Sequence, residues 1–306
     1  MNANRKWPER PPVEDEHALE AHLDRIEADG ETRAFCRDLA GDGLARIDLG
    51  AEGRALCDRV VAEMDSSFEA RGVGRIQDAW LRSRAVHRLA TLPKVRRLLQ
   101  LAYGRPPFAF QTLNFRVGTQ QHTHADTIHF HSLPERFMCG VWVALEDISE
   151  ASGPLAYHPG SHKLPVLTMK AAGVNHPRPT PDDYGTTYIP ALQQRLDAAG
   201  LPRRTAVLRK GEALVWAANL AHGGSPIVDP QSTRRSLVTH FFFKDCLYYT
   251  PMTSEVEDGR LSARLPTNLQ TGGVEWPRAN GRLVPVGLGQ IVEAAVKLLL
   301  RRTHTV

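Results

Sequence analysis

The feature that most constrains the fold is a change in sequence pattern near Pro107. From there to Phe243, short segments rich in β-branched and aromatic residues alternate with Gly, Pro, Asn and Asp. Short strands separated by frequent turns are typical of a β-sandwich or barrel, and a jelly roll is a natural architecture for such a run. The predicted strands are 109–117, 137–145, 155–158, 205–210, 213–217 and 236–243.

Helical patterns occupy the sequence before this change. Apolar residues recur at helical spacing in 55–70 and 92–103, a charged segment at 14–29 has a similar pattern, and a glycine stops each one. We therefore predict one domain over 1–306, mainly β with flanking helices. It comprises a helical N-terminal part (1–105), a jelly-roll core (106–250) and a C-terminal extension (251–306).

Two segments need a separate interpretation. The stretch 164–202 separates the two halves of the predicted sheet and carries one predicted helix, 189–199. Loops this long are usually functional lids or disordered, so we predict a lid-like insertion. The segment 290–301 is predicted to be an amphipathic helix that packs against the domain or a partner subunit in a homo-oligomer, in preference to a membrane surface.

Composition narrows the class of protein. No run of eighteen apolar residues predicts a membrane span, and the polar N-terminus lacks the apolar stretch of a secretory signal, so a cytoplasmic location is expected. A net charge of +4 without a stripe of Lys and Arg interleaved with aromatics argues against nucleic acid and suits a small-molecule substrate, including an anionic one. The four cysteines form no Cys-x-x-Cys pair, so neither a thiolate metal site nor a disulfide framework is predicted.

Histidines are concentrated in the segment 120–131, which contains four of them and an aspartate. At a strand end, residues two apart share a face, so His124 and Asp126 project together. A short His-x-Asp motif alone arises often by chance. The third residue that gives it weight is His222, in a turn after a later predicted strand.

Two histidines and one carboxylate on one face of an iron(II) ion leave three positions open, enough for a bidentate 2-oxo acid and for dioxygen. The far carboxylate of such a cosubstrate needs an anchor, and an arginine pairs with it bidentately. Arg234, twelve residues after His222 and just before a predicted strand, is the candidate.

These residues belong to an ordered set of motifs that resembles the phytanoyl-CoA dioxygenase family of iron(II)/2-oxoglutarate oxygenases. The resemblance runs from about 110 to 243, and its motifs are, in order, His124-x-Asp126, Trp142-Val-Ala-Leu-Glu-Asp-Ile-Ser, Gly153-Pro-Leu, Pro159-Gly-Ser-His-Lys163, His222-Gly-Gly-Ser and Arg234. It implies a double-stranded β-helix (a jelly-roll, cupin-like core), an Fe(2+) ion, and 2-oxoglutarate and O2 as cosubstrates. By position it implies His124, Asp126 and His222 as metal ligands and Arg234 as the 2-oxoglutarate anchor. Trp142 would line the cosubstrate pocket, and Asn114 lies on a strand that often supplies another polar contact.

The chain departs from the family pattern in two places. The position two residues after the distal histidine, often a hydroxyl in the family, is Gly224 here, so Ser225 becomes the candidate. Arg235 is a rival to Arg234 because the spacing is one residue longer than usual. The retained Asp126 favours hydroxylation or desaturation over halogenation, since related halogenases replace this carboxylate with a small residue.

Other interpretations stay open at this stage. A zinc hydrolase uses the same ligand types but has no need for Arg234. A cupin-type dioxygenase would use His122 with His124 instead of Asp126, and a jelly-roll binding protein would form no succinate. A structural role is the commoner one for His122, His129 and His131, Trp142 suits a plain core position equally well, and the Pro159-Gly-Ser-His turn is structural.

For the substrate we predict contacts from His129, His131, Tyr184 and Tyr248, because the 164–202 insertion and the Tyr248-Tyr249 segment would border the pocket. Their mixture of histidines, tyrosines and acids favours a specialised metabolite or a sugar-like compound, with an acyl thioester second. Family membership by itself does not fix the substrate.

Overall fold

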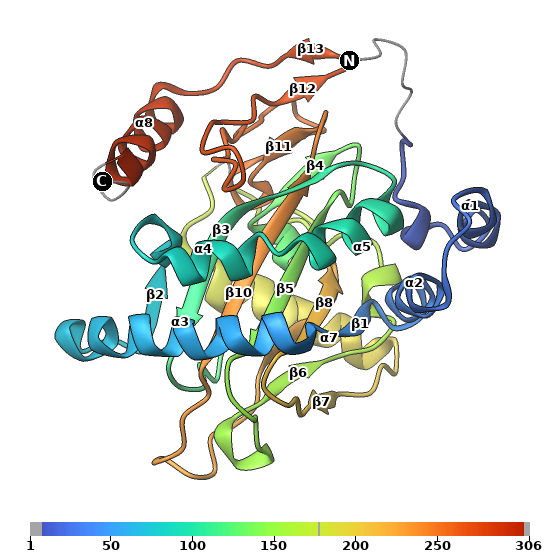
Figure 1. Cartoon of the computed structure of the whole chain (residues 1–306). Helices are drawn as coiled ribbons and strands as arrows, with labels where there is room; N and C mark the ends of the chain where they lie inside the picture. The colour runs from blue at the N-terminus through green and yellow to red at the C-terminus, as the bar shows by residue number, and fades with distance from the viewer. Residues whose placement is uncertain (1–7, 177, 303–306) are drawn as a thin grey trace.

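A six-stranded antiparallel sheet forms the centre of the molecule in the computed structural model, which describes residues 8–176 and 178–302 (Figure 1). Neighbouring strands come from distant parts of the chain. Their order is β1 (Leu44–Asp48), β8 (Glu212–Ala217), β5 (Met138–Ala144), β10 (Ser236–Phe243), β3 (Pro107–Phe115) and β2 (Arg75–Gln77).

The two faces of this sheet pack against different layers, because alternate residues of a strand point to opposite sides. In β8, Ala213 and Val215 join a large apolar cluster with the helices, whereas Leu214 and Trp216 join a smaller one on the other face. The helices that cover the first face are α3 (Gly50–Arg71), α4 (Arg84–Ala90) and α5 (Pro93–Tyr103) (Figure 1).

A smaller sheet packs against the face of the central sheet that the helices do not cover. Its strand order is β7 (Arg204–Ala206), β6 (Leu155–Tyr157) and β9 (His222–Gly224). The smaller apolar cluster, which includes Trp142, Leu155 and Leu208, fills the space between the two sheets. The predicted fold class is confirmed: the core is mainly β, in the double-stranded β-helix arrangement, with helices on its flank.

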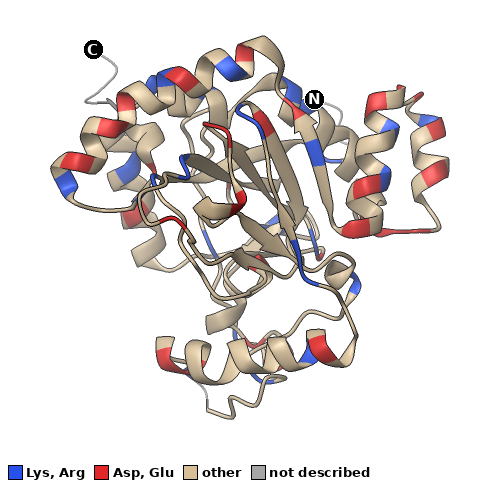
Figure 2. Ribbon diagram, turned by 90° about the horizontal axis from the view of Figure 1, so that it is seen from below, with Lys and Arg blue, Asp and Glu red and all other residues tan. Residues whose placement is uncertain are grey.

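The remaining elements are short or peripheral. They are η1 (Pro12–Glu14), α1 (Leu19–Arg25), α2 (Gly30–Asp42), η2 (Ala79–Leu81), η3 (Asp126–Ile128), β4 (His131–Leu133), η4 (Glu150–Ser152), η5 (Ser161–Lys163), α6 (Pro181–Asp183), the π-helical η6 (Tyr184–Tyr188), α7 (Ile189–Ala198), β11 (Leu247–Tyr249), η7 (Pro251–Thr253), β12 (Arg278–Ala279), β13 (Arg282–Leu283) and α8 (Leu288–Arg302). Strands β4 and β11 pair with each other. Figure 2 shows acidic and basic residues interspersed along the helices.

The helix predicted over 14–29 is present only as the shorter α1, Leu19–Arg25, so its predicted bounds are wrong. Gly30 begins α2 instead of ending a helix, because the Asp29 side chain accepts a hydrogen bond from the backbone N–H of Thr32 and caps the new helix. The prediction also omitted β1 and β2, which are too short to show a pattern and gain their hydrogen bonds only from distant strands.

The 164–202 insertion packs closely against the core. Tyr188, Leu192 and Leu196 form an apolar cluster with Ile128, which lies two residues after Asp126, and with Ala221, which precedes His222. The insertion therefore touches the two segments that carry the predicted metal ligands.

The C-terminal helix α8 is anchored by polar contacts. Lys297 pairs with the carboxylate of Asp78 at 2.9 Å, and Gln290 accepts a hydrogen bond from Leu265 N. Within residues 8–176 and 178–302, no helix is long and apolar enough to cross a membrane. The four cysteines are buried and free.

Candidate metal and cosubstrate site

Three potential metal ligands meet between the two sheets. One ligand atom each from His124, Asp126 and His222 lies within 4.8 Å of the others, and all three residues are buried. His124 and His222 form an antiparallel β-bridge, in which the N–H of each donates to the carbonyl of the other at 2.9 and 2.8 Å. This bridge holds the two imidazoles side by side, and Asp126 follows at the start of η3.

Both histidines are held in the same orientation. Nδ1 of His124 lies 2.9 Å from the carbonyl oxygen of His122, and Nδ1 of His222 lies 2.9 Å from that of Leu220. A carbonyl only accepts, so each Nδ1 carries the proton and each Nε2 keeps its lone pair. The lone pair of His124 Nε2 accepts a hydrogen bond from the Gln121 amide at 3.3 Å. Burial, together with the neighbouring His222, lowers the pKa of His124 to about 3, so its imidazole stays neutral. Neutral imidazole is the form that binds a metal.

The carboxylate of Asp126 is oriented by the indole of Trp216 and faces the imidazole of His240. The indole N–H of Trp216 donates to Oδ2 at 2.8 Å, and Nε2 of His240 lies 3.5 Å from the same oxygen. Burial alone would raise the pKa of Asp126, but the facing His240 and His222 hold it well below its usual range. The ionised carboxylate thus has its second oxygen, Oδ1, free on the side of His124.

A glycine makes room for that indole. A Cβ atom at Gly140 on β5 would lie 2.2 Å from the Trp216 ring, which sits directly opposite it on β8. The sequence of β5 is therefore adapted to the residue that holds Asp126.

We expect Trp216→Phe to weaken metal binding by roughly 10- to 100-fold, the usual cost of losing an outer partner of a metal ligand. The substitution removes the N–H that orients Asp126 and keeps a ring over Gly140. Anaerobic titration with Mn(2+), followed by electron paramagnetic resonance, measures the affinity directly. An affinity equal to that of the wild type would contradict this role for the indole.

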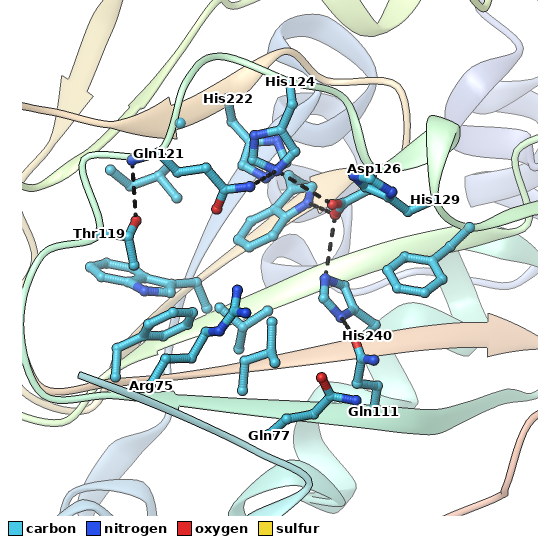
Figure 3. Close-up of a pocket in the computed structure, with 18 of the residues that line it drawn as sticks. Arg75, Gln77, Gln111, Thr119, Gln121, His124, Asp126, His129, His222 and His240 are labelled. Atoms are coloured by element: carbon cyan, nitrogen blue, oxygen red, sulfur yellow. Dashed lines mark hydrogen bonds and ion pairs between the residues drawn. The ribbon is translucent and has the colours of Figure 1, made fainter. Parts of the chain in front are cut away.

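A cavity of about 250 Å³ opens beside the three residues. Its lining comes from both sheets and includes Phe115, Thr119, Gln121, His129, Phe130, Trp142, Leu155, Trp216, Gly223, Arg234, Val238 and His240, with Arg75, Gln77, Gln111 and Leu113 from β2 and β3. Figure 3 shows His124 and His222 on one side of this cavity and Arg75, Gln77 and Gln111 across from them.

Arg234 lines the cavity and is buried, with 4% of its surface exposed. Its Nη1 donates to the carbonyl of Gly153 at 3.0 Å, but its Nε has no partner among the described residues, and no carboxylate there pairs with it. Burial lowers the pKa of its guanidinium to about 10, so the group is still charged at neutral pH. The rival Arg235 is engaged elsewhere, in ion pairs with Asp65 and Glu146.

The other predicted cosubstrate residues do not all lie in the cavity. Trp142 lines it, as predicted, with the Arg234 guanidinium 5.6 Å from its ring. Asn114 does not: it lies on the face of β3 that is turned towards the helices, in register with Ile76, so this prediction is corrected. The residues of β3 that do line the cavity are Gln111, Leu113 and Phe115, as the two-residue period of a strand requires.

The contact expected from Ser225 stays a prediction, because its hydroxyl is buried without a partner among the described residues. Its side chain is buried outside the cavity lining, and Thr119 provides the hydroxyl there. Packing explains why position 224 is a glycine. A Cβ atom there would lie 2.8 Å from the backbone nitrogen of Gln120, so the larger residue of the family pattern does not fit.

Of the four predicted substrate residues, one lines the cavity and a second packs against that residue. His129 lines it, and the ring of Tyr184 in the insertion packs on His129 at 5.1 Å between centroids. Tyr248 is corrected, because it is 1% exposed in the helix-side core and its hydroxyl donates to the carbonyl of Phe243. His131 is corrected as well, because it is 1% exposed in the β4–β11 pair, beside Tyr249.

Because His131 is buried without a partner for either ring nitrogen among the described residues, it should destabilise the protein at acid pH. Burial, with Arg136 nearby, lowers its pKa to about 3, whereas an unfolded histidine titrates near 6.5. Between these values the unfolded state binds the extra proton, so stability falls as the pH falls. We expect His131→Leu to lose about 1 kcal/mol less stability than the wild type between pH 6.5 and 5.5.

Urea unfolding at pH 7.5, 6.5 and 5.5 measures this difference, with the wild type as the reference for every other titrating group. A parallel loss of stability in the two proteins would show that His131 accepts a proton in the folded state.

Sequence reasoning did not anticipate His240, Trp216, Gln111, Arg75 or Gln77. Trp216 and His240 each share a strand face with a buried apolar residue two positions earlier, Leu214 and Val238. The two-residue period of the strands therefore indicated that their side chains also point into the interior. No local signal distinguishes Arg75 or Gln77, because β2 is only three residues long.

Solved structures with a similar fold include enzymes described as non-heme and alpha ketoglutarate dependent. The epimerase SnoN, solved with Fe3+, alpha ketoglutarate and nogalamycin RO, is 22% identical, with a TM-score of 0.54 over 75% of this chain and 86% of that one. The carbocyclase SnoK from nogalamycin biosynthesis is 17% identical, with a TM-score of 0.55 over 73% and 87%. EctD from S. alaskensis, solved with 2-oxoglutarate and 5-hydroxyectoine, is 15% identical, with a TM-score of 0.52 over 93% and 90%.

At these identities the likeness establishes the fold, and no curated protein matches the sequence. The family comparison goes further. The sequence pattern of the family described as Phytanoyl-CoA dioxygenase (PhyH) matches residues 20–236, which is more than half of the chain. This chain therefore belongs to the phytanoyl-CoA dioxygenase family and is an enzyme that uses non-haem iron, 2-oxoglutarate and O2.

Proposed function

We propose that this enzyme hydroxylates an unactivated C–H bond of a small molecule, with His124, Asp126 and His222 as the iron ligands and Arg234 as the anchor of 2-oxoglutarate. The observation that carries the proposal is Arg234, a buried guanidinium without a carboxylate partner among the described residues, in the same cavity as the three ligands. Leaving a charged group buried and unpaired is costly, so a dicarboxylate cosubstrate supports its presence.

The donor set fits iron(II). Two neutral imidazoles and one ionised carboxylate form the facial triad of non-haem iron oxygenases, which leaves coordination sites open. When bound, iron(II) with 2-oxoglutarate and dioxygen supplies the oxidant for the C–H bond, with release of succinate and CO2.

The protein's own contribution is binding and exclusion of water. Arg234 binds the far carboxylate of the cosubstrate, and Trp142 and Phe115 flank its guanidinium at 5.6 and 5.9 Å. Phe130 and Trp216 provide apolar surface elsewhere in the cavity. This surface keeps water from the reacting centre, and the retained Asp126 supports hydroxylation over halogenation.

Two alternatives are less well supported. A zinc hydrolase would have no use for the unpaired Arg234. A cupin-type ligand set would need the side chain of His122, but this residue is exposed, and only its carbonyl, which faces His124, contributes to the site.

For the substrate, a specialised metabolite or sugar-like compound is favoured over an acyl thioester. The cavity presents several polar side chains besides the metal ligands, including Thr119, Gln121, Gln77 and Gln111. Amide and hydroxyl groups match the hydroxyls of such a compound better than they match a hydrocarbon chain.

Anaerobic titration of the purified protein with iron(II) and 2-oxoglutarate tests the proposal. The expected result is the weak visible charge-transfer band of the iron–2-oxoglutarate chelate, and succinate formation once O2 and a metabolite extract are added. Folded, iron-loaded protein that shows no such band would contradict the proposed function.

A further inference from the structure

The part of the cavity across from the metal ligands is built by β2 and β3. Arg75 and Gln77 lie on β2 in register with Phe115 and Leu113 of β3. Gln111, which also lines the cavity, lies on β3 two residues before Leu113. The register and the two-residue period place all five side chains on the same face of the sheet. Figure 3 shows Arg75, Gln77 and Gln111 together on this wall, which we call the β2–β3 wall.

Charge on this wall is not balanced by the protein. Among the described residues that line the cavity, Asp126 is the only acid, and it belongs to the metal site. Arg75 lines the cavity and is also exposed to solvent, and it has no ion pair or side-chain hydrogen bond to a described residue. Arg116, just after β3, pairs instead with Glu69 outside the cavity.

The proposed iron site is already neutral when loaded. Its positive charges are the two of iron(II) and the one of Arg234. They are balanced by the negative charge of Asp126 and the two carboxylates of 2-oxoglutarate. This balance rests on the proposed function. It leaves Arg75 as a single positive charge facing the space that the cosubstrate does not use.

We propose that the substrate is a small organic acid, whose singly charged acid group pairs with Arg75. A carboxylate is the best geometric match, because a guanidinium binds it through two parallel N–H groups. Gln77 and Gln111 then bind the polar atoms between the acid group and the carbon that is oxidised. The β2–β3 wall is a specificity subsite, separate from the Arg234 anchor.

The hydrogen bond of Gln111 supports the proposal that its amide contacts the substrate between the acid group and the oxidised carbon. Its amide lies 3.1 Å from Nδ1 of His240, whose other ring nitrogen faces Asp126. This contact fixes one end of the amide, so the other end is presented to the cavity in a defined direction. An oriented amide discriminates between polar groups better than a freely rotating one.

The test uses anion-exchange fractions of a metabolite extract. Wild-type protein with iron(II), 2-oxoglutarate and O2 is incubated with the retained (anionic) and the unretained fraction, and mass spectrometry identifies compounds that gain one oxygen. We expect the oxidised compound in the retained fraction. Succinate formed without an oxidised compound in that fraction, or an oxidised compound in the unretained fraction alone, overturns the inference.

Variants locate the effect at Arg75. With the compound that gains the oxygen as substrate, Arg75→Ala should raise KM by about 10- to 100-fold with a smaller change in kcat, the range expected for losing a charged hydrogen-bonded partner. Arg75→Lys should restore part of the loss. Arg82→Ala is the matched control, because Arg82 is an exposed arginine near β2 that does not line this cavity. Equal KM values for Arg75→Ala and Arg82→Ala overturn the inference.

The two proposals fail in different ways. Wild-type protein that forms neither the charge-transfer band nor succinate contradicts the proposed function. Wild-type protein that forms the band and succinate, but shows no preference for anionic compounds, contradicts only the role of Arg75.

Discussion

Asp126→Ala should abolish iron binding and reduce succinate formation by at least about 1000-fold. The substitution removes the only carboxylate of the ligand set, and the loss should exceed the roughly 10- to 100-fold effect of changing an outer partner. It also leaves the N–H of Trp216 buried without its acceptor, which costs about 1–3 kcal/mol of stability. Anaerobic Mn(2+) titration and thermal unfolding separate the two effects.

His122→Ala is the matched control for this experiment. It keeps the backbone carbonyl that accepts the hydrogen bond from His124, and it removes an exposed imidazole. We expect unchanged metal affinity. If His122→Ala lost the metal and Asp126→Ala kept it, the ligand set would be that of a cupin-type dioxygenase.

Arg234→Ala should weaken 2-oxoglutarate binding by a factor on the order of 30 or more. Truncating one partner of a buried, hydrogen-bonded charge pair costs about 2–5 kcal/mol. Arg234→Lys should recover only part of this, because an ammonium keeps the charge but not the bidentate fork. The charge-transfer band, titrated against 2-oxoglutarate in the iron-loaded protein, measures each affinity.

The control for Arg234 is Arg116→Ala, which removes a positive charge that pairs with Glu69 outside the cavity. It should leave the 2-oxoglutarate affinity within about twofold, since exposed ion pairs contribute little. An unchanged affinity in Arg234→Ala would mean that another group anchors the cosubstrate, and would reopen the hydrolase alternative.

Local sequence pattern was sufficient for the inner strands β5, β8 and β10 of the central sheet, but not for its edge strands β1 and β2. The prediction for 236–243 agrees with β10. The prediction for 137–145 is one residue longer than β5 at each end, and that for 213–217 lacks the first residue of β8. These segments are buried on both faces, so they are rich in apolar and β-branched residues. The helix predicted over 14–29 was too long, because α1 ends at Arg25 and Asp29 caps the next helix, which charge and periodicity do not reveal.

For the site, the order of motifs in the sequence predicted the three ligands and Arg234, and the structure brings all four to one cavity. It could not assign Asn114, since a shift of one residue along a strand moves a side chain to the other face. It could not exclude Tyr248 either, because burial of its ring in the helix-side core is decided by residues far away in the chain.

The sequence by itself determined the family, the double-stranded β-helix and the chemical type of the metal site, because these depend on residue types in a fixed order. Only the tertiary structure decided what surrounds the metal site: the indole of Trp216 and the imidazole of His240 on Asp126, and the β2–β3 wall with Arg75. The reason is physical. Strand pairing joins segments from distant parts of the chain, and neither its register nor the facing of its side chains is encoded in any one segment.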